Sequence, residues 1–120
     1  MPGENAAPLT EAAYYILLSL YEPLHGYGIM QRVAQMSGGR VRLGAGTLYG
    51  ALSTLVAKGW LVEGAQYDRK KEYHITAAGQ AVVQGEMQRL AELLYNGQEV
   101  TGGSAGRDLA AGANPAEGGR

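Results

Sequence analysis

The stretch from Gly44 to Gly59, GAGTLYGALSTLVAKG, decides the fold. Its large apolar residues recur with the period of an α-helix that buries one stripe, at Leu48, Leu52, Leu55 and Val56. Gly44 stands at the N-cap position, and Gly59 follows the last periodic residue, where helices commonly end. The sequence therefore predicts an amphipathic helix between these two glycines.

The opposite face of this predicted helix is small and almost uncharged. Around one large side chain, Tyr49, it carries Thr47, Gly50, Ala51, Ser53 and Thr54. A solvent-facing helix usually carries Glu, Lys and Gln, which have high helix propensity and stay hydrated. A smooth face suits close approach to another surface, and the uncovered amides of the first turn suit a phosphate. The pattern also fits an ordinary short helix of a small α protein.

The composition limits the class of protein. A chain of 120 residues has the common size of one domain. It holds no cysteine, which excludes a disulfide framework, a thiol nucleophile and a Cys-based zinc site. No apolar run approaches the ~20 residues of a membrane span, and the first residues lack the basic flank and apolar core of a signal peptide. We therefore expect a soluble cytoplasmic protein with no membrane partner.

The charges are segregated along the chain. The formal net charge is only -1. Residues 26–76, however, hold seven bases against three acids, a local balance of +4, so the remainder carries -5. A basic middle flanked by acidic ends indicates an anionic partner on one face of the molecule.

Two further helices are expected before the opening stretch. After an N-terminal arm over residues 1–9, Thr10 is expected to cap a helix that runs to about Glu22 and is stopped by Pro23. This helix is apolar on nearly every side, which suggests a subunit interface. The turn at residues 25–28 opens a second helix, and residues 37–39 end it. Residues 40–43 then link it to the helix described first, as in a helix-turn-helix, although this connection is longer than the tightest form.

A β-hairpin is expected after the third helix. Residues 60–63 and 71–76 are β-prone and surround a basic tip at residues 64–70. Alternation places Trp60 and Val62 on one face of the first strand, and Tyr73 and Ile75 on one face of the second. Added to the helix pair, the hairpin gives a winged helix-turn-helix over residues 10–76. The predicted fold class is thus mainly α with a small β-hairpin (α+β).

A last helix over residues 77–96, capped by Thr76, is expected to dimerise the chain. Its apolar residues are spaced as in a coiled-coil seam. Together with the first helix they give a predicted dimer interface of Ile16, Leu17, Leu20, Val83, Met87, Leu90 and Leu94. A cavity between these helices, lined by Tyr14, Leu17, Met87 and Leu90, is the expected place for a small effector. Residues 97–120 are rich in Gly, Ala and Ser, so we expect a disordered tail.

The candidate DNA contacts lie on the opening helix, its linker and the hairpin. Cations on a hairpin tip neutralise phosphates without reading sequence. Tyr49 either contacts a phosphate or a base edge, or is a half-buried aromatic side chain. Tyr27 either contacts a phosphate or packs against the protein. Cations on the extended linker either contact phosphates or pair with surface acids. The full predicted set is Tyr27, Arg40, Arg42, Ala45, Thr47, Tyr49, Ser53, Arg69, Lys70 and Lys71.

Metal, cofactor and catalytic sites are not expected. His25 and His74 lack carboxylate companions at metal-ligand spacing. The sequence contains no phosphate-binding loop, no Ser/His/Asp arrangement and no paired carboxylates with an obvious pocket. We therefore predict a protein that is not an enzyme.

Six segments together resemble the PadR family of transcriptional regulators. They are LTEA (9–12), YIL (15–17), HGY (25–27), GTLYGAL (46–52), GWLV (59–62) and RKKEYHIT (69–76). The resemblance implies a homodimeric winged-helix repressor of the subfamily with one short C-terminal helix, which each chain exchanges with its partner. It also implies double-stranded DNA as a partner and release when a small, often aromatic, ligand binds.

Three departures from the family pattern stand beside this resemblance. Relatives often have Pro where this chain has Ala45, at the first helical position. The basic wing is short, and the only tryptophan is Trp60, whereas some relatives carry one on the last helix that stacks on flat drugs. An alternative function, a winged-helix module that binds a protein instead of specific DNA, fits the same fold. The basic linker and wing argue against it.

Overall fold

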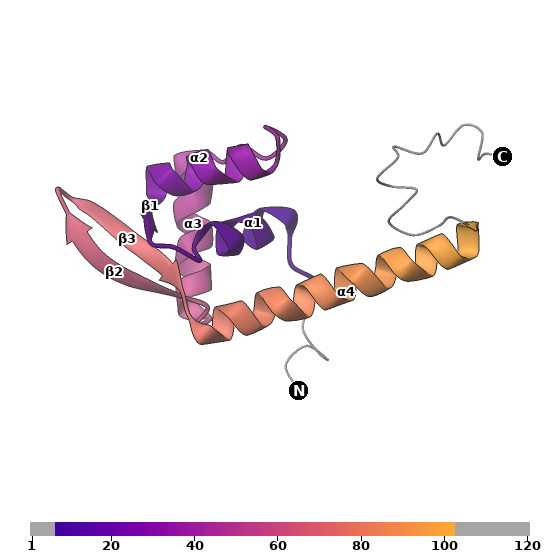
Figure 1. Ribbon diagram of the computed structural model, residues 1–120. Helices are drawn as coiled ribbons and strands as arrows, with labels where there is room; N and C mark the ends of the chain where they lie inside the picture. Colours follow the sequence, from indigo (N-terminus) through magenta and orange to yellow (C-terminus); the bar gives the residue numbers. More distant parts are fainter. Residues whose placement is uncertain (1–6, 103–120) are drawn as a thin grey trace. The chain divides into compact units, whose positions relative to one another are not determined.

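The computed structural model describes residues 7–102 and confirms an α+β winged helix (Figure 1). The chain divides into two units, Met1–Glu86 and Met87–Arg120, with the boundary inside the last helix. The elements in chain order are α1 (Glu11–Ser19), β1 (Leu24–His25), α2 (Gly26–Met36), α3 (Ala45–Ala57), β2 (Leu61–Tyr67), β3 (Lys70–Ile75) and α4 (Ala77–Thr101). No helix in the described range is long and apolar enough to cross a membrane.

Helix α1 begins where the sequence predicts and ends early. The Thr10 side chain accepts a hydrogen bond from the Ala13 amide at 3.0 Å, as an N-cap residue does. The helix stops at Ser19 instead of Glu22, and the next two amides, of Leu20 and Tyr21, bond to carbonyls only three residues back at 3.1 and 3.4 Å. The Leu20 carbonyl accepts a hydrogen bond from the Ile75 amide at 2.8 Å, which ties this end of α1 to the end of β3.

The sheet has three antiparallel strands in the order β1-β3-β2, whereas the sequence predicted only a hairpin. In β1, Leu24 pairs with Tyr73 and His25 pairs with Glu72. A strand of two residues is too short to show any alternation of apolar and polar residues, so the pattern could not reveal it. Strand β1 ties the start of α2 to the hairpin.

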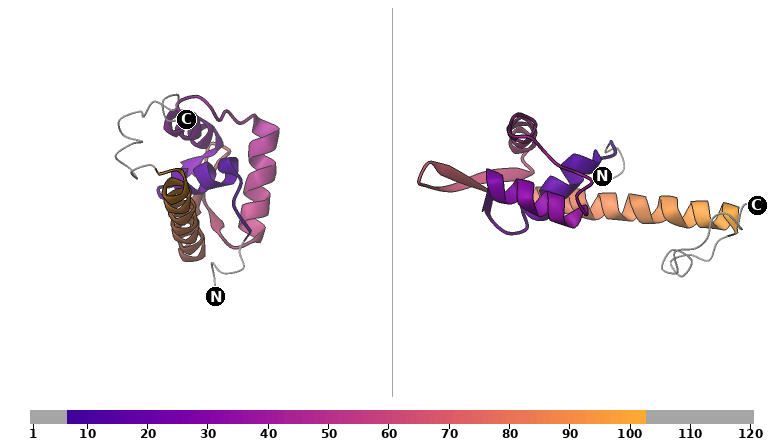
Figure 2. Two further views of the ribbon diagram at one scale, coloured as in Figure 1. Left: turned by 90° about the vertical axis from the view of Figure 1, so that its right-hand side faces the viewer. Right: turned by 90° about the horizontal axis from the view of Figure 1, so that it is seen from above.

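The hairpin is longer than predicted, and its tip is correspondingly smaller. Gln66 pairs with Lys71 and Tyr67 with Lys70, so only Asp68 and Arg69 connect the strands. Both have positive φ, 47° and 66°, which suits a two-residue turn whose twist matches that of the strands. Figure 2 shows this hairpin, the wing, extending beyond the helices of the first unit.

The prediction about the faces of the second hairpin strand is confirmed, since Tyr73 and Ile75 are both buried. In the first strand, Trp60 precedes β2 and Val62 is exposed. Leu61 points inward instead, and it is buried together with Tyr73 and Ile75. The strand begins one residue later than expected.

The core combines the inward faces of α1, α2, α3, the sheet and the start of α4. The predicted stripe of α3 is confirmed, since Leu48, Leu52 and Leu55 are buried and Val56 is half-buried. The buried apolar residues are Ile16, Leu17, Leu20, Ile29, Val33, Leu48, Leu52, Leu55, Leu61, Tyr73, Ile75 and Val83.

This core corrects part of the predicted dimer interface. Ile16, Leu17 and Leu20 are 0% exposed in the single chain, and Val83 is 1% exposed. Side chains covered within their own unit present no surface to a partner, so these four are core residues. Leu17 is inaccessible to an effector cavity for the same reason. The sequence shows that α1 is apolar all round, but not what covers it.

Helix α4 is capped as predicted and ends later. The Thr76 hydroxyl accepts from the Gly79 amide at 3.0 Å and donates to the Gly59 carbonyl at 2.7 Å. The helix continues past Asn96 to Thr101, because a single interior glycine at position 97 weakens a helix by only ~1 kcal/mol. Gly102, with φ of 80°, ends it. Residues 97–101, which were predicted to begin the tail, therefore belong to α4. Residues 103–120 lie outside the described range.

Close packing at Gly79 gives a first prediction. A Cβ there would overlap the Trp60 carbonyl oxygen and lie 2.7 Å from Ile75 Cγ1. Gly79→Ala should lower the free energy of unfolding by about 1–3 kcal/mol, because the obstructing carbonyl belongs to the backbone. A lower midpoint of urea denaturation with an unchanged slope would show this destabilisation.

Gly97→Ala is the matched control for Gly79→Ala, since a Cβ at Gly97 meets nothing within 4 Å. It makes the same helical substitution in open space and should leave stability equal or improved. Equal denaturation midpoints for the two variants would contradict the packing argument.

Candidate nucleic-acid interface

The exposed face of α3 is the surface that the sequence predicted for DNA. Ala45, Thr47, Tyr49 and Ser53 are all exposed, on the side away from the buried stripe. The helix contains no charged residue from Ala45 to Ala57. Such a face lets the helix backbone come close to a second surface without burying an unpaired charge.

The first turn of α3 leaves its backbone donors uncovered. Gly44 is the N-cap and contributes no side-chain hydrogen bond. A Cβ placed at Gly44 or Gly46 would meet nothing within 4 Å, so the space around this turn is open. Unsatisfied amides at a helix N-terminus, reinforced by the helix dipole, favour an anion such as a phosphate oxygen.

The wing carries three exposed cations that differ in their ion pairing. Lys71 Nζ lies 3.3 Å from Glu63 Oε1, and this ion pair partly counters the lysine charge. Arg69 and Lys70 form no ion pair with another described residue. Arg69 in the turn and Lys70 at the start of β3 are therefore the two wing cations without an ion-pair partner among the described residues.

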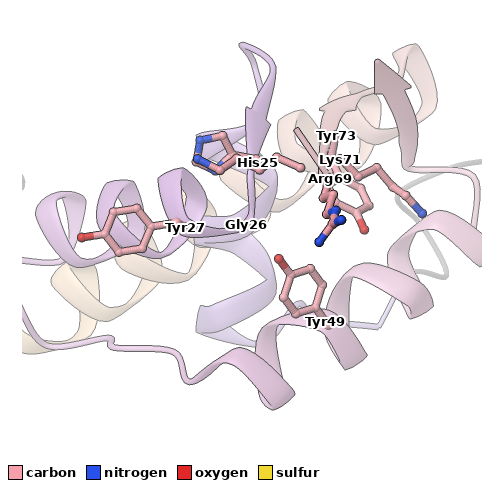
Figure 3. A pocket seen from close by; sticks show the side chains of 8 residues that line it. His25, Gly26, Tyr27, Tyr49, Arg69, Lys71 and Tyr73 are labelled. Atoms are coloured by element: carbon pink, nitrogen blue, oxygen red, sulfur yellow. The ribbon is translucent and has the colours of Figure 1, made fainter. Parts of the chain in front are cut away.

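A cleft of about 440 Å³ joins these two surfaces (Figure 3). Its lining includes the three wing cations, three tyrosines and no carboxylate: His25, Gly26, Tyr27, Tyr49, Arg69, Lys70, Lys71 and Tyr73. Burial raises the pKa of the Tyr73 hydroxyl above its usual range. The charge of the lining suits an anion.

The PadR-like family of transcriptional regulators matches residues 16–85, a range that contains α3, the wing and every residue of the cleft. The chain belongs to this family.

The PadR-like chain is also similar to individual proteins. An uncharacterized 37.1 kDa protein in transposon TN4556 of Streptomyces fradiae is 37% identical over 84 residues, which are 69% of this chain and 24% of that protein. H. salinarum RosR is 30% identical with a TM-score of 0.61, over 73% of this chain and 80% of RosR. A PadR-like transcription factor from Bacteroides fragilis is 22% identical with a TM-score of 0.61, over 74% and 87% of the two chains.

The winged-helix assignment has independent support. A winged-helix DNA-binding protein from STIV is 16% identical, with a TM-score of 0.59 over 72% of this chain and 95% of that protein. At this identity the likeness concerns the fold alone. It confirms that helices and hairpin are arranged as in a winged helix.

The linker cations of this PadR-like chain differ from each other. Val41 and Leu43 pack against the core, so Arg40 and Arg42 both face outward, as the predicted alternation requires. Arg40, however, forms a two-pronged ion pair with Glu11, which holds the pKa of that carboxyl below its usual range. Arg42 forms no such pair among the described residues, so its charge is the one that an external anion can meet.

Tyr27 lies on the surface. Its ring is exposed, its hydroxyl accepts a hydrogen bond from Gln31 Nε2 at 3.3 Å, and Figure 3 shows it turned away from Tyr49. Sequence reasoning missed the contributions of His25, Gly26 and Tyr73 to the cleft. No local pattern marks them, because the β1–β3 pairing brings them together.

Proposed function

We propose that the chain is a homodimeric DNA-binding transcriptional regulator that acts as a ligand-responsive repressor of a pseudo-palindromic operator. The observation that carries the proposal is the uncharged, exposed face of α3 beside the unpaired cations of the wing. The major groove of DNA admits an α-helix, and small side chains let the helix enter it deeply. Hydroxyls at Thr47 and Ser53 then reach base edges or phosphates, while Arg69 and Lys70 contact the flanking backbone.

The second unit supports the dimer. Of the predicted seam, Met87, Leu90 and Leu94 remain, and all three are exposed on α4. Leu93 and Tyr95 are exposed as well, so large apolar side chains are concentrated in this part of the helix. Each such side chain contributes ~1.5–3 kcal/mol when it is fully buried. Pairing of two chains through this stripe would bring two α3 helices to half-sites ~34 Å, or a multiple of that distance, apart.

We also propose a small hydrophobic or aromatic effector at the dimer interface. Its support is the family resemblance and the exposed apolar side chains of Met87 and Leu90. Tyr14 is half-buried, and Leu17 takes no part because the core encloses it. Trp60, which lies in the first unit beneath Lys58 with 5.1 Å from Nζ to the ring centroid, should not respond directly to such a ligand.

Selection of duplexes from a random library by the purified chain, followed by fluorescence anisotropy, tests the proposal. The selected duplex should bind at least about 10³-fold more tightly than a scrambled duplex at physiological salt. Equal affinity for all duplexes would contradict operator recognition. It would favour the alternative function, a winged-helix module that binds a protein.

The wing gives a prediction that separates its cations. Lys70→Ala should weaken binding to every duplex about equally, and should lower the salt slope by about 1 for each phosphate that the variant no longer neutralises. The neighbouring Lys71→Ala is the matched control and should have the smaller effect, because Glu63 already counters the Lys71 charge at 3.3 Å. Titration of each variant against the selected and scrambled duplexes gives both quantities. A weakening confined to the selected duplex would mean that Lys70 reads bases.

A further inference from the structure

The ring of Tyr49 sits directly on Gly26. A Cβ built on Gly26 would overlap the Tyr49 hydroxyl oxygen and lie 2.8 Å from Cζ. Figure 3 shows the tyrosine rising from α3 with its hydroxyl pointing toward the chain at Gly26 and toward the wing residues Arg69 and Tyr73. Although Tyr49 belongs to the exposed face of α3, only 47% of it is accessible, because its tip occupies this position.

Space, and not backbone conformation, explains the glycine at position 26. Gly26 is the first residue of α2, and it is absent from the residues with positive φ. Any residue could adopt its backbone angles. A glycine in a helix is otherwise less favourable than alanine. What position 26 excludes is a side chain, and the atoms that such a side chain would meet belong to Tyr49.

The contact joins three elements that bear on the proposed DNA interface. Gly26 begins α2 immediately after His25, which pairs with Glu72 of the wing strand β3. Tyr49 lies in the first half of α3 and lines the same cleft as Arg69 and Tyr73. The tip of one side chain therefore lies where α2, α3 and the wing meet.

We propose that Tyr49 is a positioning residue: seated on Gly26, its ring fixes the wing relative to the first turn of α3, and its hydroxyl does not read bases. The inference rests on the proposed DNA binding, because it explains how the spacing between helix contacts and wing contacts is set. That spacing decides whether both surfaces reach one DNA duplex together.

Four variants test the inference by operator affinity. Gly26→Ala should reduce affinity about 10-fold with little change in melting temperature, since the new methyl meets only the movable end of a tyrosine. Tyr49→Phe keeps the contact between the ring and Gly26, and should bind the operator within about 3-fold of wild type. Tyr49→Ala removes this contact and should weaken binding about as much as Gly26→Ala does. The double variant Gly26→Ala/Tyr49→Ala should be no weaker than Tyr49→Ala alone.

Two results would overturn the inference. A Tyr49→Phe protein as weak as Tyr49→Ala would make the hydroxyl a direct DNA contact. Additive effects in the double variant would mean that Gly26 and Tyr49 act separately.

NMR of the free protein distinguishes this inference from the proposed function. Wild type should show a nuclear Overhauser effect between Gly26 Hα and the Tyr49 ring, and Gly26→Ala should shift the amide resonances of residues 68–71. Unshifted wing amides would refute the positioning role even if DNA binding were normal. If the shifts are present but wild type binds no duplex, the proposed function is wrong, whereas the positioning of the wing by Tyr49 is still supported.

Discussion

Operator affinity is expected to fall by about 10³ between 50 and 200 mM salt. Arg42, Arg69 and Lys70 are the predicted contacts that form no ion pair with another described residue. Two protomers would then neutralise about 6 phosphates, and each neutralised phosphate releases counterions from the DNA. Arg40 and Lys71 already face Glu11 and Glu63, which keeps the expected decrease at the lower end of the range for such proteins.

Anisotropy titrations at four salt concentrations measure this slope. The logarithm of affinity should decrease with the logarithm of salt concentration with a slope of about -5. A slope shallower than about -2 would mean that the wing and linker cations do not contact phosphates. Arg40→Gln should leave the salt slope nearly unchanged, because Glu11 already pairs with Arg40.

Leu90→Glu should disrupt assembly more than any other single change proposed for this chain. Leu90 is 41% exposed and lies between Met87 and Leu94 on the stripe that we propose as the dimer contact. A glutamate there would place one buried carboxylate from each chain near the two-fold axis without a partner. Dimer dissociation should increase by more than about 100-fold, and operator affinity should fall with it.

Sedimentation equilibrium at micromolar concentration, paired with operator titration, decides this prediction. Gln88→Glu is the matched control, because it adds the same charge to the exposed side of α4 away from the stripe. It should remain dimeric and bind DNA normally. A monomeric wild type, or a Leu90→Glu protein that dimerises and binds as wild type does, would refute the dimer.

Local signals in the sequence predicted local structure well. Thr10 and Thr76 cap their helices through hydrogen bonds to amides three residues ahead, so a short stretch of sequence contains the whole interaction. The stripe of Leu48, Leu52 and Leu55 likewise needs only helical periodicity. The family match then covers residues 16–85, which include α3 and Thr76.

Features that depend on distant partners could not be predicted in this way. The Arg40–Glu11 ion pair joins residues far apart in the chain, and the sequence left its existence open. Ile16, Leu17 and Leu20 looked like an interface because periodicity reports which faces are apolar and not which element covers them. The contact between Gly26 and Tyr49 requires the arrangement of α2 against α3 and left no pattern at either residue.

Strand β1 has a consequence for how the domain folds. Its pairing with β3 closes a long loop of chain that contains α2, α3 and β2. The entropy of closing such a loop is lost before the two short strands gain their hydrogen bonds, so we expect this pairing to form late, after the helices have docked. The sheet that supports the wing, the cap of α2 and the end of α1 then become ordered in one cooperative step. A destabilised variant is therefore expected to lose the pairing of β1 with β3 first, while α2 and α3 are still docked on α1.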